Sequence, residues 1–312
     1  MISLLKDGSV LVDVGPMTMV IRAETNGKAL PKWAEVGANE GLRALAQVAS
    51  FKKLLFRKAC GIKEDASFPQ VVNRMITATR ATKDSSLTPM AAVAGSISDE
   101  VADFLFQRKD ITKVIANNGG DIAIRLRGND SVTVGGKVGL EEAGLSYTFA
   151  IGVNDGIAGV ATSGLGGRSF TKGIASAAMA LASSAALADA AVTVLGNATN
   201  VSDSQIERRL AGELDPDTDI YDELVTVKVG DLEEEKIEDA LSNGLAEASR
   251  LQKEGKILGA LLVVKGRWVK TGWLSEKGVS LVNLNYLIRK LGNINDKQNC
   301  QLGRSKPTLQ RK

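Results

Sequence analysis

The sequence predicts an α+β protein in which mixed sheets and packed helices surround one core. Stretches with strand-like alternation and stretches with helical hydrophobic spacing both occur along the 312 residues. Hydrophobic residues make up 44% of the chain and charged residues 24%, as in ordinary globular proteins. Because no fixed-period repeat or long linker divides the sequence, we expect one domain over 1–275 and a weakly structured basic tail over 276–312.

The first half of the chain predicts strands, then helices, then strands again. Gly and Pro interrupt strands, and Thr followed by Pro is typical of a helix start. In order, the expected elements are two strands within 10–21 broken at Gly15-Pro16, a helix over 34–57, a helix from Phe68-Pro69, a helix from Thr88-Pro89, and strands at 113–116 and 122–126.

The second half predicts further strands and an alanine-rich helix. In order, the expected elements are strands at 145–153 and 156–161, a long helix over 173–195, a helix from the capping box at 204–207, a strand at 224–229, a helix capped by Asp231 that ends before Gly255, and strands at 260–264 and 267–269.

Charge is unevenly placed. The net charge is +3, yet residues 289–312 alone hold seven Lys or Arg and one Asp. Such a tail can contact nucleic acid or anionic lipid, but a solvated chain end is the expected state. Aromatic residues are only 4% of the chain, which argues against stacking platforms for single strands. We therefore expect no nucleic-acid partner.

The sequence also predicts a cytoplasmic protein with no membrane partner. Charge follows the N-terminus too soon for a secretory signal, and no stretch is apolar enough to span a bilayer. The two cysteines, Cys60 and Cys300, form neither a disulfide framework nor a CxxC metal motif.

The chain contains no histidine. This excludes Ser-His-Asp triads, Cys-His dyads and histidine-ligated zinc. Any catalysis must use carboxylates, hydroxyls, lysine, backbone dipoles or a metal with oxygen ligands.

The first polar constellation, Asn117 to Asp121, lies between two predicted strands. Gly119 and Gly120 would let the backbone approach a ligand closely, and Asn118 and Asp121 add polar side chains. The same residues are also ideal for a plain hairpin turn, so both interpretations stand.

The second constellation is the glycine-rich stretch 162–169, which follows a predicted strand. Loops of this kind bind anions, and Arg168 would pair with a carboxylate or phosphate. Thr162 or Ser163 is a candidate nucleophile, with Lys172 as the local residue to activate it. The alternative is a surface turn.

The third constellation is Asp189 and Thr193, four residues apart in a predicted apolar helix and therefore on one face. A carboxylate in such surroundings is costly unless it is paired or binds a metal. Together with backbone carbonyls, the two side chains form a partial oxygen cage suited to Mg²⁺ or Ca²⁺. The alternative is that Asp189 accepts hydrogen bonds from loop amides.

In this order, the three constellations resemble the ApbE-like superfamily. Its flavin transferases carry a Gly-Gly-Asp segment, a Thr-Ser-Gly turn and an Ala-Asp-x-x-x-Thr helix, which match 119–121, 162–164 and 188–193 here. The stretches 88–95 and 186–191 are more similar to an uncharacterised prokaryotic branch of that superfamily. The transferases' histidine segment has no counterpart, and 168–170 occupies its place.

The resemblance implies a set of site residues. Asp189 and Thr193 would bind a divalent cation, expected to be Mg²⁺, with FAD as a candidate ligand. The catalytic residues would be Thr162, Ser163 and Asp189. The residues that would bind the cofactor are Asn118, Gly119, Gly120, Asp121, Gly164, Arg168 and Ser169.

Two classes of function follow. The favoured one is an ApbE-like, metal-assisted transferase or hydrolase that acts on a flavin nucleotide or on a small anionic or cyclic-amide metabolite. The other is a non-catalytic flavin-binding or metabolite-binding protein on the same scaffold. Helix faces built from small residues are compatible with a homodimer.

Overall fold

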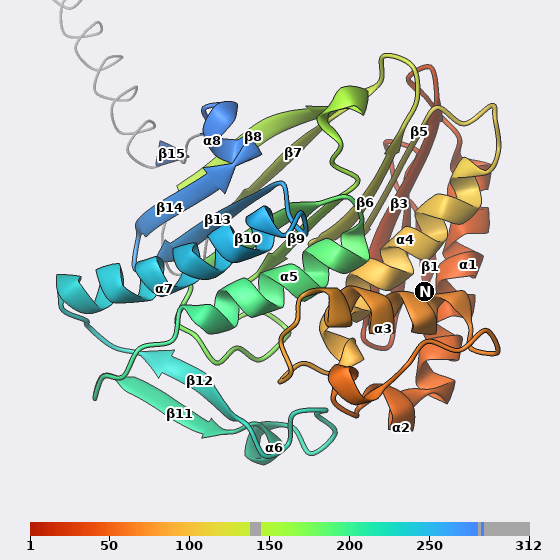
Figure 1. Cartoon of the computed structure of the whole chain (residues 1–312). Coiled ribbons are helices and arrows are strands. Elements are labelled where there is room, and N and C mark those ends of the chain that lie inside the picture. The colour runs from red at the N-terminus through yellow and green to blue at the C-terminus, as the bar shows by residue number, and fades with distance from the viewer. Residues whose placement is uncertain (138–144, 280–281, 284–312) are drawn as a thin grey trace, which may run out of the picture.

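The central feature of the fold is a ten-stranded antiparallel sheet (Figure 1). The computed structural model describes residues 1–137, 145–279 and 282–283. The strands of the large sheet are β1 (Ile2–Leu4), β2 (Val10–Val14), β3 (Met17–Thr25), β4 (Lys28–Ala29), β5 (Lys113–Asn118), β6 (Asp121–Leu126), β9 (Gly159–Ser163), β10 (Ala177–Ala182), β13 (Gly259–Val264) and β14 (Arg267–Gly272). Their order is β1-β2-β3-β5-β6-β9-β10-β13-β14, with β4 paired to β3.

Helices cover one face of this sheet (Figure 1). They are α1 (Pro31–Ser50), α2 (Lys52–Leu55), α3 (Gln70–Ala81), α4 (Val93–Phe106), α5 (Ala185–Ala198) and α7 (Glu234–Lys253), and the single-turn helices η1 (Ala59–Gly61) and η2 (Pro89–Ala92) connect them. Helices α4 and α5 lie next to each other over the middle of the sheet. The predicted α+β class is therefore confirmed.

The opposite face of the sheet is covered by β7 (Ser131–Lys137) and β8 (Leu145–Gly152), to which β15 (Val282–Asn283) adds a third strand. The short elements η3 (Val153–Asp155) and α8 (Trp273–Glu276) flank this small sheet. A separate ribbon of β11 (Ile206–Leu210) and β12 (Leu224–Val229), with α6 (Ala211–Leu214), extends below the body (Figure 1).

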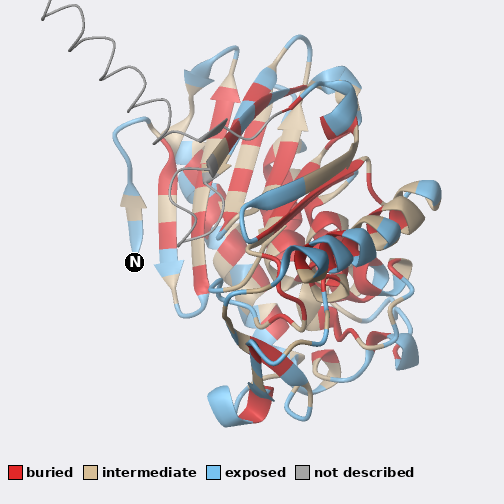
Figure 2. Cartoon of the chain, turned by 90° about the vertical axis from the view of Figure 1, so that its left-hand side faces the viewer, coloured by how far each residue is buried: buried red, intermediate tan, exposed pale blue. Residues whose placement is uncertain are grey.

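Alternating side chains let one strand serve the cores on both faces. Ala178 and Ala180 of β10 belong to the core beneath α5 and α7, whereas Met179 and Leu181 pack toward β7 and β8. Figure 2 shows the result: buried residues follow the strands, and the exposed residues are on the outer sides of the helices and in the loops.

The predicted helix over 173–195 is wrong in its first half. Residues Ala177–Ala182 form β10, and α5 begins only at Ala185, with the Ser184 hydroxyl accepting a hydrogen bond from the Leu187 amide at 3.2 Å. An apolar run of alanines does not distinguish a buried strand from a helix. Here pairing with β9 and β13 on both edges decides for the strand.

The predicted helix at the 204–207 capping box is also wrong. Ile206–Leu210 is strand β11, and its register with β12 places Glu207 opposite Lys228. The preceding turn is closed by the Asp203 side chain, which accepts a hydrogen bond from the Gln205 amide at 2.8 Å. Pairing with a distant segment overrides the local helix signal.

Two predicted helix starts are shifted. Thr88 caps as expected, accepting a hydrogen bond from the Met90 amide, but it opens η2, and α4 starts at Val93. Helix α7 begins at Glu234 with Glu233, rather than Asp231, in the capping position. Gly255 follows the helix end with φ of +66°, as predicted.

No helix among the described residues is long and apolar enough to cross a membrane. The expected basic tail lies mostly outside the described residues, so the boundary near residue 275 stays a prediction.

Candidate functional site

The structure brings the three polar constellations together at one end of the sheet. Strands β5 and β6 form a hairpin in which Asn118 pairs with Asp121, and β6 pairs with β9. The Thr162 hydroxyl at the end of β9 reaches the Gly120 carbonyl at 3.5 Å. Helix α5, which carries Asp189 and Thr193, packs on β6 and β9.

The turn at Gly119 and Gly120 needs glycine at both positions. Their φ angles are +69° and +114°, and a Cβ on Gly120 would lie 2.6 Å from the Thr162 hydroxyl. The Gly120 amide donates to the Asn117 side chain at 2.9 Å. These residues therefore form a hairpin turn, and their predicted contact with a ligand stays a prediction.

The N-terminal turns of α4 and α5 meet next to this turn. The Gly95 amide donates to Asp189 Oδ2 at 2.9 Å, and the Ala186 amide donates to Asp99 Oδ2 at 2.9 Å. A Cβ on Gly95 would lie 2.2 Å from the Ala185 carbonyl oxygen, so the two helices are in direct backbone contact. Asp189 thus accepts backbone amides, as its alternative interpretation expected, but these amides belong to a helix start.

Two carboxyl groups of this site, those of Asp121 and Asp189, have raised pKa values. Burial raises the pKa of Asp189 to about 7, although the amides of Gly95 and Ala94 oppose that rise. The pKa of Asp121 is raised well above its usual range, first by burial and then by the negative charge of Asp189. Asp121 Oδ1 is enclosed and has no hydrogen-bond partner among the described residues.

The remaining predicted site residues differ in placement. Thr193 donates its hydroxyl to the Asp189 carbonyl at 3.2 Å, which leaves the hydroxyl oxygen as an acceptor. Asn118 is buried, and its amide group lies 3.5 Å from the Ala94 carbonyl. Ser163 and Gly164 are half-buried where β9 ends.

Arg168 and Ser169 lie further out, in the exposed part of the loop that follows β9. The Arg168 guanidinium donates to the Pro16 carbonyl at 3.2 Å and to the Thr18 hydroxyl at 2.9 Å. Strands β3 and β9 lie on either side of the β5–β6 hairpin. The contact of Arg168 with the start of β3 therefore means that the loop after β9 passes over the Gly119–Gly120 turn. The structure thus gives Arg168 an anchoring role in addition to the predicted anion contact, which stays a prediction.

Lys172 has contacts of its own. It forms an ion pair with Glu223 at 3.1 Å, and its amide donates to Asn197 near the end of α5. Within the described part of the chain, no hydrogen bond or ion pair links Lys172 to Ser163.

Sequence reasoning missed Asp99 and Arg125, which lie beside the predicted residues. Asp99 is fully buried and accepts from Arg125 Nη2 at 2.8 Å. The pattern that identified Asp189, an acidic residue within an apolar helix, also applies to Asp99.

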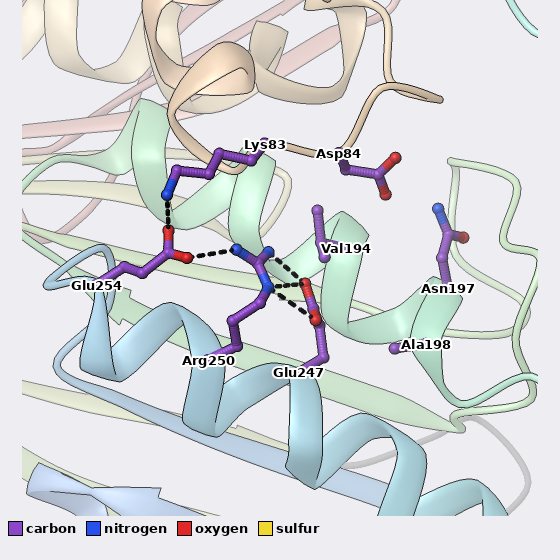
Figure 3. Close-up of a pocket in the computed structure, with 8 residues that line it drawn as sticks. All are labelled: Lys83, Asp84, Val194, Asn197, Ala198, Glu247, Arg250 and Glu254. Atoms are coloured by element: carbon purple, nitrogen blue, oxygen red, sulfur yellow. Dashed lines mark hydrogen bonds and ion pairs between the residues drawn. The ribbon is translucent and has the colours of Figure 1, made fainter.

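A surface groove of about 550 Å³ lies elsewhere, between the loop after α3, the end of α5 and α7 (Figure 3). Most of its charged side chains form ion pairs with one another: Lys83 pairs with Glu254 at 3.0 Å, and Arg250 pairs with Glu247 and Glu254. None of the predicted site residues lines it. The Asp121 Oδ1 atom, buried without a partner among the described residues, makes the α4–α5 region the better candidate.

Comparison with known proteins finds a family model that matches most of the chain and relatives that match about half of it. The model of a family described as AbpE bacteria matches residues 2–270. A UPF0280 protein of Methanosarcina acetivorans is 36% identical over 143 residues, which are 45% of this chain and 53% of that protein. UPF0280 protein MK0206 of Methanopyrus kandleri is 35% identical over 163 residues, or 51% of this chain and 63% of that protein. The matched region thus spans about half to two thirds of these relatives' length.

Solved structures show a distant similarity. The apo form of the Pseudomonas stutzeri flavinyl transferase ApbE has a TM-score of 0.49 and 12% identity, covering 89% of this chain and 96% of that one. The flavin transferase ApbE of Vibrio cholerae has a TM-score of 0.45 and 13% identity, covering 86% and 98%. The match over residues 2–270 shows that the chain belongs to the AbpE bacteria family, as its resemblance to an uncharacterised ApbE-like branch predicts.

Proposed function

We propose that this chain is an ApbE-like enzyme that uses a divalent cation to act on a flavin nucleotide or a small anionic metabolite. The observation that carries the proposal is the buried Asp121 Oδ1, which has no hydrogen-bond partner among the described residues and belongs to a carboxyl group that feels the charge of Asp189. Both aspartates are half-buried, and desolvation raises the pKa of each carboxyl group. A cation would relieve this unfavourable state, because it supplies the missing positive charge.

The donor set fits Mg²⁺ better than a metal that needs a full protein cage. No group of three or more Asp, Glu, Cys or His side chains capable of holding a metal occurs in the part of the chain that the structure describes. Mg²⁺ typically takes one or two carboxylates and completes its shell with water and ligand oxygens. Asp189 and Thr193, with Asp121, would hold the ion, which would polarise a phosphoryl or carbonyl oxygen.

The surroundings suit an anionic ligand. The turn at Gly119 and Gly120 has no side chains, so a ligand can come close to its backbone amides. The hydroxyls of Thr162 and Ser163 lie at the end of the adjacent strand β9. The resemblance in sequence makes FAD the first ligand to test, and a cyclic amide or small acid the second. We place this activity in the cytoplasm.

A non-catalytic metabolite binder is the second candidate. It is favoured by the contacts of Lys172, which is paired with Glu223, in a chain without histidine. Because Lys172 is engaged elsewhere, no residue of the described site is assigned as a general base for Ser163.

The test is a thermal-shift titration of the full chain with FAD, with and without Mg²⁺. A ligand at 100 times its dissociation constant stabilises a protein by about 2.7 kcal/mol, which is measurable as a rise of several degrees in Tm. We expect a Mg²⁺-dependent shift that is lost in Asp189→Asn and Asp121→Asn. The exposed Asp239→Asn variant on α7 is the matched control and should behave as wild type.

The outcomes separate the candidates. Conversion of FAD, followed by chromatography of the flavin, supports the enzyme, whereas a shift without conversion supports the binder. An equal Mg²⁺ response in wild type and Asp189→Asn would contradict the cation site.

A further inference from the structure

Helices α4 and α5 cap each other. Helix α4 begins after Ala92, which provides no side-chain cap, and Asp189 of α5 accepts the amide of Gly95 in its place. In return, Asp99 of α4 accepts the amide of Ala186 in the first turn of α5. Carboxylates at helix N-termini satisfy free amides and interact favourably with the helix dipole.

The two aspartates differ in what holds them. Both Asp99 oxygens are engaged, because Oδ1 accepts from Arg125 Nη2 at 2.8 Å while Oδ2 accepts from Ala186. Arg125 belongs to β6, the strand that starts at Asp121, and its Nη1 donates to the Ile124 and Ala158 carbonyls at 3.0 and 3.2 Å. Asp99 therefore connects the first turn of α5 to the sheet through a fixed guanidinium.

We propose that Asp99 is a positioning residue for Asp189. Asp189 follows Ala186 by less than one helical turn, so fixing the Ala186 amide also fixes where the Asp189 carboxylate lies relative to Gly95 and Asp121. The structural part of this proposal stands on the hydrogen bonds alone, whereas its functional part rests on the proposed cation site. Without Asp99, the start of α5 loses its connection to β6, and the Asp121–Asp189 pair loses its alignment.

The chain offers a closely matched pair of variants. In Asp99→Asn, the amide group cannot accept from both Arg125 and Ala186, because both partners are donors. Asp103→Asn suffers the same conflict between Arg125 Nε at 2.7 Å and Arg74 Nη2 at 2.8 Å. Both variants thus remove one ion pair from Arg125, but only Asp99 contacts α5.

Two measurements on the full chain test the proposal. Amide hydrogen exchange of Gly95 and Ala186 reports whether Asp189 and Asp99 still cap, and calorimetric titration with Mg²⁺ alone reports cation affinity. We expect the Gly95 amide to exchange at least about tenfold faster in Asp99→Asn than in Asp103→Asn. Only the Asp99 change removes the bond to Ala186 that holds Asp189 against Gly95. The Mg²⁺ dissociation constant should rise about tenfold in Asp99→Asn only, as is typical of residues that orient metal ligands.

Each result has a defined meaning. Equal Gly95 exchange in the two variants would overturn the positioning role, as would equal Mg²⁺ affinity in both when wild type binds Mg²⁺. If wild type binds no Mg²⁺, the proposed function fails, while the exchange of Gly95 still decides whether Asp99 positions Asp189.

Discussion

Asp189 has a structural task in the fold and a chemical one in the proposed function. Its carboxylate accepts amides from the start of α4, which favours the charged form, yet burial wins and raises its pKa to about 7. The neighbouring Asp121 is affected in the same direction. The folded protein therefore holds protons at neutral pH that the unfolded chain would release.

This predicts an unusual pH dependence of stability. Because the folded-state pKa of Asp189 exceeds its ordinary value of 3.8, the stabilisation is complete below about pH 4 and is lost as the pH rises toward 7. The free energy of unfolding should fall by up to about 1.4 kcal/mol per pH unit per carboxyl in that window. Urea denaturation at pH 4.5 to 7.5 measures it.

The matched variant is Asp189→Asn, which has no carboxyl to titrate at this position. Its stability should vary less with pH than that of wild type, and the remaining slope should reflect Asp121 and Glu100, whose pKa burial also raises. Parallel pH profiles for wild type and variant would contradict the prediction. Saturating Mg²⁺ should flatten the wild-type profile if the cation binds here.

At the scale of elements, the crossing of α4 and α5 depends on a missing side chain. Gly95 lies where a Cβ would be 2.2 Å from the Ala185 carbonyl oxygen and 2.9 Å from the Ala186 nitrogen. These are backbone atoms and cannot rotate away, so the helices would have to separate. Separation would also break both capping bonds.

We therefore expect Gly95→Ala to lower the free energy of unfolding by about 3 kcal/mol or more, at the upper end for overpacked sites. Gly41→Ala is the control, because Gly41 also lies inside a helix and its added Cβ would meet Val101 at an ordinary 3.4 Å. That change should be neutral, or stabilising by up to about 1 kcal/mol through helix propensity. Similar losses in both variants would show that the crossing is not the cause.

Sequence patterns predicted the elements whose local preference agrees with their tertiary contacts, such as the hairpin at Asn117 to Asp121 and the strands around Gly15. They failed where distant pairing decides, as in β10 and β11. For the site, the order of motifs selected Gly120, Thr162 and Asp189, which the fold does bring together. The same pattern of an acidic residue in an apolar helix marks Asp99, but its role could not be predicted, because the Ala186 amide that it accepts lies almost 90 residues away along the chain.

At the scale of the whole molecule, the large sheet joins the cores on its two faces. Val101 lies in the core under α1 and α4, and Leu261 in the core toward β7 and β8, yet both cores include residues of the hairpin strand β6, Ala123 and Ile124. Disturbing one core should therefore weaken the other.

We expect a single unfolding transition for the described domain. Val101→Ala and Leu261→Ala should each lower Tm by several degrees, because deleting buried aliphatic groups costs about 1 to 5 kcal/mol. Far-ultraviolet circular dichroism and tryptophan fluorescence should give coincident melting curves for wild type and both variants. Separate transitions in either variant would indicate that the two faces fold independently.

The raised pKa values of Asp121 and Asp189 also make this protein unusually simple to study by proton counting. In most proteins, imidazoles dominate proton uptake and release near neutral pH, but this chain has none. Calorimetry in buffers of different ionisation enthalpy counts the protons released when a cation binds. Because no imidazole contributes, the number of protons released near pH 7 would report how far Asp121 and Asp189 were protonated before the cation bound. No isotope label or chromophore is needed.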